Sequence, residues 1–439
     1  MNEIVSNLLV YGSLPEDSIL WQLADICEKL KNQTETKAAL RTRVFHQVKN
    51  LLTVATDYAF DKNLWHNYLT FLLITNENPF SLVCEKMGAQ DGTVNNFVTH
   101  DFDMFKELFD YDFSWLEKEL SIDCFTQLTH YQAIRKKELM YNKNVSEKVR
   151  TLSEKLETAK SGAGFFKYVT EFYKDFGVGM FGLNKAFRIA ENGDGSVRFL
   201  PINNMDAVML DDLIGYELQK KKLVENTQAF CDGKAANNVL LFGDSGTGKS
   251  TSIKAIVNQF YPQGLRMIEI YKHQFKDLST IIAQIKNRNY KFIIYMDDLS
   301  FEEFEIEYKF LKAVIEGGVE TKPDNVLIYA TSNRRNLVRE RATDKLEIAD
   351  DNDLHSSDTV QEKLSLVYRF GVRIYFGKPD KKQFQEIVRT LAARYGVTMP
   401  EEELLLKANQ WEISHGGLTG RAAQQFIDYI VGTEEEKKK

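Results

Sequence analysis

Residues 243–250 read Gly-Asp-Ser-Gly-Thr-Gly-Lys-Ser and match the phosphate-binding pattern G-x-x-x-x-G-K-[ST] at every fixed position. The glycines let the backbone wrap closely around phosphates, so that successive N–H groups point inward as donors. In such a loop Lys249 reaches the β- and γ-phosphates, and the Ser250 hydroxyl binds Mg²⁺. The residues expected to contact a nucleotide here are Gly243, Asp244, Ser245, Gly246, Thr247, Gly248, Lys249, Ser250 and Thr251.

The segments on either side of this loop suit the same chemistry. An apolar, strand-like run at 238–242 leads into the loop, and a helix-compatible stretch at 251–260 leaves it. The N-terminus of such a helix adds its partial positive charge to the phosphate site. Strand, loop and helix therefore predict together a site for ATP with Mg²⁺.

A second apolar run, at 292–296, ends in Asp297 and Asp298. A buried strand that delivers a carboxylate to its C-terminal end is what a magnesium-bound triphosphate requires. We expect Asp297 to bind Mg²⁺ through water, and Asp298 to polarise the attacking water. The alternative is that both carboxylates merely end a strand.

A third run, at 326–330, leads into Thr331, Ser332 and Asn333. An amide at this strand end could lie beside the γ-phosphate and the attacking water, and Asn333 is the best candidate. Asparagine also ends strands simply as a turn former, so that reading stays open.

Arginine side chains at three places could complete the site. Arg369 comes just before the last strand-like run and could reach a γ-phosphate across a subunit boundary, or form a surface ion pair. Arg421 follows Gly420 at a helix start and could contact the nucleotide from a lid. Arg334 and Arg335 could serve either purpose, or lie on a solvated surface.

The surrounding pattern changes along the chain. Residues 1–185 look mostly helical, residues 186–204 form a β-hairpin linker, and residues 205–379 alternate strand and helix. Five apolar runs in the third region predict a parallel sheet covered on both faces. They lie at 238–242, 266–271, 291–296, 325–330 and 372–376. Residues 380–431 are again helical, and residues 432–439 form a tail.

Two segments leave alternatives open. The aromatic stripe Phe102, Phe105, Phe109, Phe113 and Leu116 could be a partner-binding face, but a helical core is the better interpretation. The acidic segment 340–363 could be a docking insertion, although its composition also fits a solvated loop.

Composition limits the classes of function. The chain has 439 residues, is 43% hydrophobic and 27% charged, and carries a net charge of −7, so no global basic field draws it to nucleic acid or anionic membrane. Four scattered cysteines indicate reduced thiols in a cytoplasmic protein rather than a zinc site. The first residues do not read as a signal peptide, and no apolar run approaches the roughly 18 residues that span a bilayer. We therefore expect no membrane partner.

The phosphate loop, the two-Asp strand, the Thr-Ser-Asn strand end, Arg-Phe-Gly and the Gly-Arg helix start occur in an order that resembles an AAA+ ATPase module over about residues 205–431. The first two correspond to Walker A and Walker B. More closely, the segments at 211–217, 297–302 and 330–335 are similar to the bacterial AAA+ group called domain of unknown function 815, and that resemblance extends upstream to the hairpin near 187–200.

The resemblance implies a five-stranded parallel sheet ordered 5-1-4-3-2, followed by a C-terminal helical lid. Adenine would lie between that lid and the linker Ile214, Gly215 and Tyr216. The sensor-1, arginine-finger and sensor-2 roles would fall on Asn333, Arg369 and Arg421.

One departure from the family pattern concerns hydrolysis. Most AAA+ hydrolases end the third strand with Asp-Glu, whereas this chain has Asp297 and Asp298. The shorter carboxylate puts the catalytic base in doubt, with Glu302 or Glu303 as substitutes. Hydrolysis is then slow or needs activation.

Three functions follow as hypotheses. The first is an ATPase that assembles with nucleotide into a homo-oligomer and remodels or loads an unidentified protein or nucleic-acid client. The second is a P-loop phosphotransferase acting on a small molecule, which the arginine series disfavours. The third is an ATP-dependent switch or scaffold with very slow hydrolysis, which the Asp-Asp ending keeps open.

Overall fold

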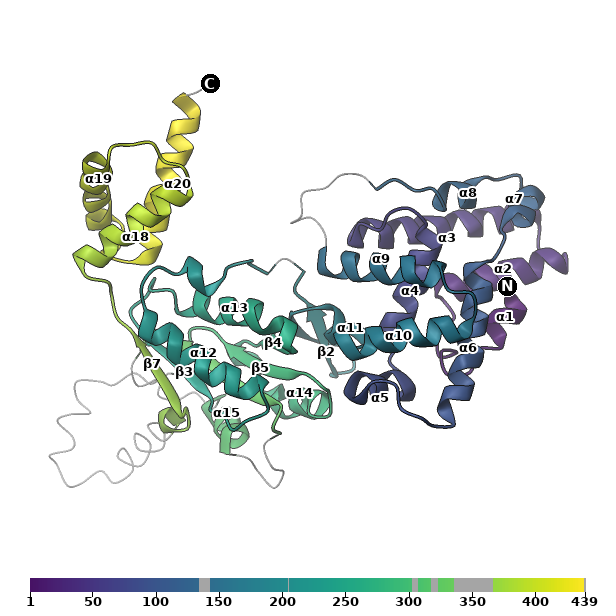
Figure 1. The fold of residues 1–439 in the computed structure, drawn as a ribbon, viewed down its shortest axis with the longest axis horizontal. Coiled ribbons are helices and arrows are strands. Elements are labelled where there is room, and N and C mark those ends of the chain that lie inside the picture. Colours follow the sequence, from purple (N-terminus) through teal and green to yellow (C-terminus); the bar gives the residue numbers. More distant parts are fainter. Residues whose placement is uncertain (134–142, 204, 302–306, 317–322, 335–365, 438–439) are drawn as a thin grey trace. The chain divides into compact units, whose positions relative to one another are not determined.

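The computed structural model describes residues 1–133, 143–203, 205–301, 307–316, 323–334 and 366–437 (Figure 1). The chain divides into two compact units. The first contains Met1–Asn184 and Pro201–Asn204, and the second contains Lys185–Leu200 and Met205–Lys439. The acidic segment 340–363 lies outside the described residues. Over the part that is described, no helix is both long and apolar enough to cross a bilayer.

The first unit is built of helices, as expected. They are α1 (Asn2–Ser6), α2 (Ile19–Lys31), α3 (Lys37–Tyr58), α4 (Leu64–Thr75), α5 (Pro79–Met87), α6 (Val94–Phe109), α7 (Ser114–Leu120), α8 (Cys124–Leu128), α9 (Lys143–Glu157), α10 (Gly162–Phe176) and α11 (Gly179–Leu183). The aromatic stripe lies in their common core, with Phe102, Phe105 and Leu116 no more than 1% exposed. The core interpretation of this stripe is therefore confirmed.

The second unit is organised around one sheet. Its strands are β1 (Ala186–Glu191), β2 (Val197–Pro201), β3 (Val239–Gly243), β4 (Leu265–Glu269), β5 (Lys291–Met296), β6 (Val326–Ser332) and β7 (Val372–Phe376). The spatial order is β2-β1-β4-β5-β6-β3-β7. The five strands from β4 to β7 have the expected order 5-1-4-3-2, so the predicted fold class is confirmed.

The hairpin that was expected to link two domains belongs to this sheet. Its strand β1 pairs in parallel with β4, with Ala186 opposite Met267. The turn between β1 and β2 has Gly195 at a φ of 80°, as the Asp-Gly sequence predicts, and the N–H of Asn192 donates to the carbonyl of Ser196 at 2.8 Å. The sheet is thereby two strands wider than the sequence predicted.

The parallel pairing of β3, β5 and β6 places three functional strand ends at one edge. Leu241 of β3 lies opposite Thr331 of β6, and Met296 of β5 lies opposite Ala330. Every residue of β6 is buried, which requires cover on both faces of the sheet. The helices of this part are α12 (Glu217–Cys231), α13 (Lys249–Phe260), α14 (Leu278–Ile285) and α15 (Glu307–Glu316).

Three helices form the C-terminal lid: α18 (Lys381–Arg394), α19 (Glu401–Ser414) and α20 (Gly420–Lys437). They share a small core of their own around Phe384, Val388 and Phe426. Asp380 begins the lid as the N-cap of α18, because its carboxylate accepts from the N–H of Gln383 at 2.8 Å.

Candidate nucleotide site

The phosphate loop requires glycine where it leaves β3 and where it enters α13. Gly243 has a φ of 130°, and a Cβ there would collide with the carbonyl of Phe376 in β7. Gly248 has a φ of 91°, and a Cβ would lie 2.8 Å from Cδ2 of Leu213. Both positions combine a left-handed backbone with close packing, so a side chain would displace the loop.

Lys249 lies inside the curl of this loop and is only 6% exposed. Its Nζ donates to the carbonyls of Gly243 at 3.1 Å and Asp244 at 2.6 Å, and to Oδ1 of Asn333 at 2.9 Å. Burial lowers the pKa of this ammonium from its ordinary value, while three nearby carboxylates, first that of Asp298, act in the opposite direction. These three partners are all acceptors, so the ammonium is held as a donor at the mouth of the loop.

Asp297 is the point where three elements meet. Its Oδ1 accepts hydrogen bonds from the hydroxyls of Ser250 at 2.7 Å, Tyr295 at 2.7 Å and Thr331 at 2.6 Å. Desolvation raises the pKa of this carboxyl, but the bonds from Thr331, Tyr295 and Ser250 outweigh it, and the pKa falls below its ordinary value. The group is therefore a carboxylate at neutral pH.

Asp298 follows with a left-handed backbone, at a φ of 49°. Its N–H donates to Oγ1 of Thr331 at 2.9 Å, and its Oδ1 accepts from Nδ2 of Asn333 at 2.8 Å. Asn333 therefore bridges the Lys249 ammonium through its Oδ1 and the Asp298 carboxylate through its Nδ2. The proposed substitutes for Asp298, Glu302 and Glu303, lie outside the described residues, as does Arg335.

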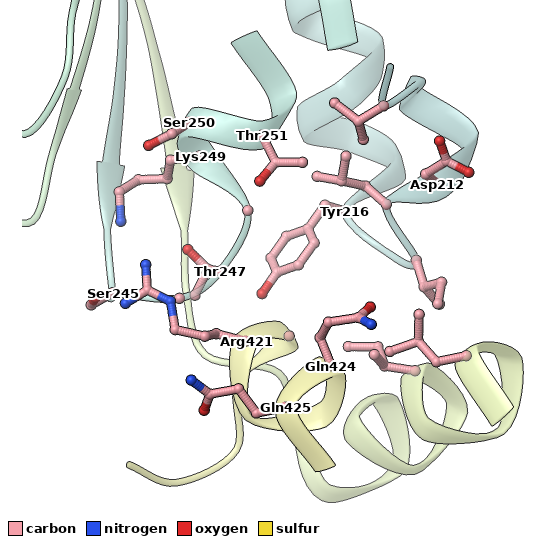
Figure 2. A pocket seen from close by; sticks show the side chains of 18 of the residues that line it. Asp212, Tyr216, Ser245, Thr247, Lys249, Ser250, Thr251, Arg421, Gln424 and Gln425 are labelled. Carbon is pink, nitrogen blue, oxygen red and sulfur yellow. The ribbon is translucent and has the colours of Figure 1, made fainter. Parts of the chain in front are cut away.

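A cavity of about 970 Å³ opens between the phosphate loop, the segment 207–216 and the lid. Most of the predicted residues line it: Ile214, Tyr216, Ser245, Gly246, Thr247, Gly248, Lys249, Ser250, Thr251, Asp297, Asp298, Asn333 and Arg421 (Figure 2). Gly215, Gly243 and Asp244 lie beside these residues in the chain without lining the cavity. Arg369, although described, is exposed in the turn before β7 and is not part of the lining.

The lid contacts the phosphate loop directly. The N–H of Arg421 donates to the carbonyl of Gly246 at 3.2 Å, and Figure 2 shows its side chain extending from the lid toward the loop. At the other end of the cavity, Arg394 of α18 forms a 3.2 Å ion pair with Asp212. Ile387, Leu391 and Tyr395 of α18 and the following turn line this end of the cavity together with Ile214, which packs against the lid core, and they give it apolar walls.

The linker residue Tyr216 connects the cavity to the start of the lid. Its hydroxyl donates to the carbonyl of Gly377 at 2.9 Å, and its ring packs on Phe376 with the centroids 5.1 Å apart. Burial, helped by the charge of Asp244, raises the pKa of this hydroxyl to about 12. The hydroxyl therefore keeps its proton and acts as a donor at neutral pH.

The donor set fits a magnesium ion that shares its ligands with phosphate. Within the described ranges, no three His, Cys, Asp or Glu side chains gather at one point to hold a metal alone. Ser250 would provide one oxygen ligand and the adjacent Asp297 carboxylate would hold the ion through water, and Mg²⁺ normally takes its remaining ligands from phosphates and water. The residues that would hold the ion are these two.

Several residues of this site were missed in the sequence. Two of them, Tyr295 and Thr331, bind Asp297. The sequence gives a weak indication of their role, because Tyr295 lies two positions before Asp297 and Thr331 two positions before Asn333, which places each pair on one strand face. The lid residues Arg394, Gln424 and Gln425 carry no such signal. Only the packing of the lid over the loop reveals them.

We predict that Thr331→Val weakens the hold on Mg²⁺. The substitution removes the hydroxyl that donates to Asp297 and accepts from the N–H of Asp298. A lost hydrogen bond to a charged group costs about 1.5–3 kcal/mol, so the Mg²⁺ concentration needed for tight binding of a fluorescent ADP analogue should rise about tenfold or more. Thr331→Ser keeps the hydroxyl and should behave like the wild type. An unchanged Mg²⁺ dependence in Thr331→Val would refute the role of this hydroxyl.

Comparison with known proteins gives a family and a distant structural likeness. Two RuvB mutants from Thermotoga maritima match at 18% and 17% identity, each with a TM-score of 0.35. Each match covers 50% of this chain, and 64% and 63% of the two RuvB chains. The matched region is therefore less than two thirds of the length of either RuvB chain. The structure titled Thermotoga maritima RuvB Holliday junction branch migration motor matches at 15% identity and a TM-score of 0.32, over 50% of this chain and 71% of that one. No curated protein gives a significant match. The family model "Protein of unknown function (DUF815)" matches residues 183–434, more than half of the chain, and the chain therefore belongs to the DUF815 family.

Proposed function

We propose that this protein is an AAA+ ATPase that binds and hydrolyses ATP with Mg²⁺. The observation that carries the proposal is the 2.7 Å hydrogen bond between Ser250 at the end of the phosphate loop and Asp297 at the end of β5. A phosphate loop joined in this way to a strand-end carboxylate is the ligand arrangement of a magnesium triphosphate site. The cavity of about 970 Å³ is large enough for a nucleotide.

Each group in the cavity has a part in this proposal. The N–H groups of residues 245–250 and the Lys249 ammonium bind the phosphates. Ser250 and Asp297 hold Mg²⁺, which when bound neutralises charge on the phosphate oxygens. The apolar walls at Ile214 and Leu391 receive the base.

Asp298 and Asn333 would act on the attacking water. In the structure, Asn333 binds both the Lys249 ammonium and the Asp298 carboxylate. A γ-phosphate that reaches Lys249 competes with Oδ1 of Asn333 for the ammonium, and this exchange would reorient the amide that holds Asp298. Asp298 then accepts the proton of the attacking water, and Arg421 reaches over the phosphates from the lid.

The hydrogen bond between Asn333 and Asp298 favours one alternative, which is an ATP-dependent switch or scaffold with very slow hydrolysis. Asp298 is one methylene shorter than glutamate, has a left-handed backbone and is held by Asn333 at 2.8 Å. A carboxylate restrained in this way positions water poorly until Asn333 releases it. Multiple turnovers separate an ATPase from a switch.

We predict that Asp298→Asn lowers steady-state phosphate release about a hundredfold or more, because a general base contributes about 10²–10⁴ to the rate. Binding of the ADP analogue should stay within about twofold, since the Asp298 carboxylate is bonded to Asn333 and not to Ser250 or Asp297. Lys249→Ala and Asp297→Asn should abolish release. The matched control is Asp324→Asn, an exposed carboxylate before β6 and remote from the cavity. Equal phosphate release from Asp297→Asn and the wild type would exclude ATP hydrolysis at this site.

The ATPase is further proposed to assemble into a homo-oligomer when nucleotide is bound, with Arg369 acting on the site of a neighbouring subunit. Support comes from the position of Arg369, which is exposed and does not line the cavity of its own chain. An arginine supplied by another subunit stabilises charge on the transferring phosphate, and such arginines contribute about 10³–10⁵ to the rate. The same proposal includes a client, which is a protein or nucleic acid that the ATPase remodels or loads. It also includes a cytoplasmic location.

For Arg369→Ala we expect assembly without turnover. Size-exclusion chromatography with light scattering should show a larger species with Mg·ATP for the wild type and for Arg369→Ala, but not for Lys249→Ala. Phosphate release by Arg369→Ala should fall about a hundredfold or more. Arg389→Ala, which removes a partly exposed lid arginine paired with Glu401, should change neither property. Full activity of Arg369→Ala, or a monomer in every condition, would remove the trans role.

A further inference from the structure

Among the described residues, no strand pairs with the outer edge of β7. The N–H of Val372 donates to Asn238 at 3.2 Å, and the carbonyl of Phe376 accepts from Asp244 at 2.9 Å, so these residues turn their main chain toward β3. Main-chain groups alternate between the two edges of a strand, which directs those of Arg373 and Tyr375 away from β3. The carbonyl of Tyr375 accepts from Nε2 of Gln219 at 3.1 Å. No hydrogen bond joins the main chain of Arg373 or the N–H of Tyr375 to another described residue across this edge.

A second hollow, of about 480 Å³, lies beside this edge between β7 and α12, which are neighbours in Figure 1. It is lined by Leu218, Gln219 and Lys222 of α12, Phe242 of β3, and Arg373, Ile374 and Tyr375 of β7. Leu218 is 74% exposed and Tyr375 is 55% exposed, so the hollow offers apolar surface to a partner.

The charged residues in the described lining of this hollow have one sign. They are Lys222 and Arg373, and none of the described lining residues is a carboxylate. Neither cation forms an ion pair with any residue that the structure describes. The Arg373 guanidinium lies over the ring of Tyr368, 5.2 Å from its centroid, which keeps the charge beside the strand edge.

An open strand edge is a template for another strand, and soluble proteins normally cover or blunt it. Here unpaired main-chain groups, apolar surface and two cations occur together. We propose that β7 and this hollow bind an extended acidic peptide segment of a partner protein, which adds as a strand along β7 and sets carboxylates against Lys222 and Arg373. Main-chain hydrogen bonds would give this segment its direction, and Leu218 and Tyr375 would receive its apolar side chains. The proposal does not depend on nucleotide turnover.

Fluorescence anisotropy on the full chain tests this surface. The probe is a fluorescein-labelled peptide of about eight residues, enough for one strand, in which pairs of glutamates alternate with pairs of valines, so that each face of the strand carries both kinds of side chain. Two matched probes are the same peptide with lysine in place of glutamate and the acidic peptide methylated at alternate amide nitrogens. We expect the acidic peptide to bind at least about tenfold more tightly than either, because one lacks the charge and the other lacks the main-chain donors.

Charge-reversal variants locate the binding. Arg373→Glu and Lys222→Glu should each weaken the acidic peptide about tenfold or more, whereas Lys221→Glu, on the next residue of α12 and outside the hollow, should not. Circular dichroism melting checks that each variant is folded. If a variant does not fold, binding of the three peptides to the wild-type chain decides the test.

Four outcomes would overturn the proposal. Equal binding of the acidic and lysine peptides would show that the charge of the hollow does not select the peptide. Equal binding of the methylated and unmethylated acidic peptides would show that the peptide does not add as a strand. Tighter binding of a labelled single-stranded DNA would point to nucleic acid instead. Light scattering could instead show self-assembly of the wild type that Arg373→Glu abolishes, while the wild type binds none of the peptides. The occupant of this surface would then be a second copy of the chain.

Discussion

Three hydroxyl groups converge on one carboxylate oxygen, Oδ1 of Asp297, and the rest of the site depends on this convergence. The hydroxyls come from Ser250 in α13, Tyr295 in β5 and Thr331 in β6. Each bond stabilises the ionised carboxylate, and together they fix the helix after the phosphate loop against two strands. The parallel order β5-β6-β3 makes the convergence possible, because it brings the carboxyl ends of these strands to one edge.

A second set of contacts ties the phosphate loop to the lid. The carboxylate of Asp244 accepts from the N–H of Lys378 at 3.0 Å, just where the chain leaves β7 for the lid. Tyr216 binds the neighbouring carbonyl of Gly377, and the N–H of Arg421 at the start of α20 binds Gly246. The loop therefore contacts both the segment that leads into the lid and the last helix of the lid, α20. A displacement of the loop changes contacts of the lid without any intervening element.

The sequence predicted the parts of this site that depend on local pattern. The phosphate loop follows a fixed spacing, and Asp297 and Asn333 end apolar runs, so their strands and their common edge were predictable. The extension of the sheet by β1 was not predictable, because the sequence of a hairpin does not reveal which strand of the sheet it will pair with. The pairing of Asn333 with Asp298 was equally hidden, because it depends on the left-handed backbone of Asp298. The predicted order 5-1-4-3-2 already placed the strand at 372–376 at an edge of the sheet, whereas the hollow between β7 and α12 depends on packing that the sequence does not reveal.

Isothermal titration calorimetry of a slowly hydrolysed ATP analogue, with and without Mg²⁺, tests the central claim most directly. The wild type should bind the analogue about tenfold or more tightly with Mg²⁺ than with EDTA, because Ser250 and Asp297 hold the ion against the phosphates. Ser250→Ala should lose that difference and bind in both conditions as the wild type does in EDTA. A wild type that does not bind the analogue, or a Ser250→Ala variant with the full Mg²⁺ effect, would contradict the account.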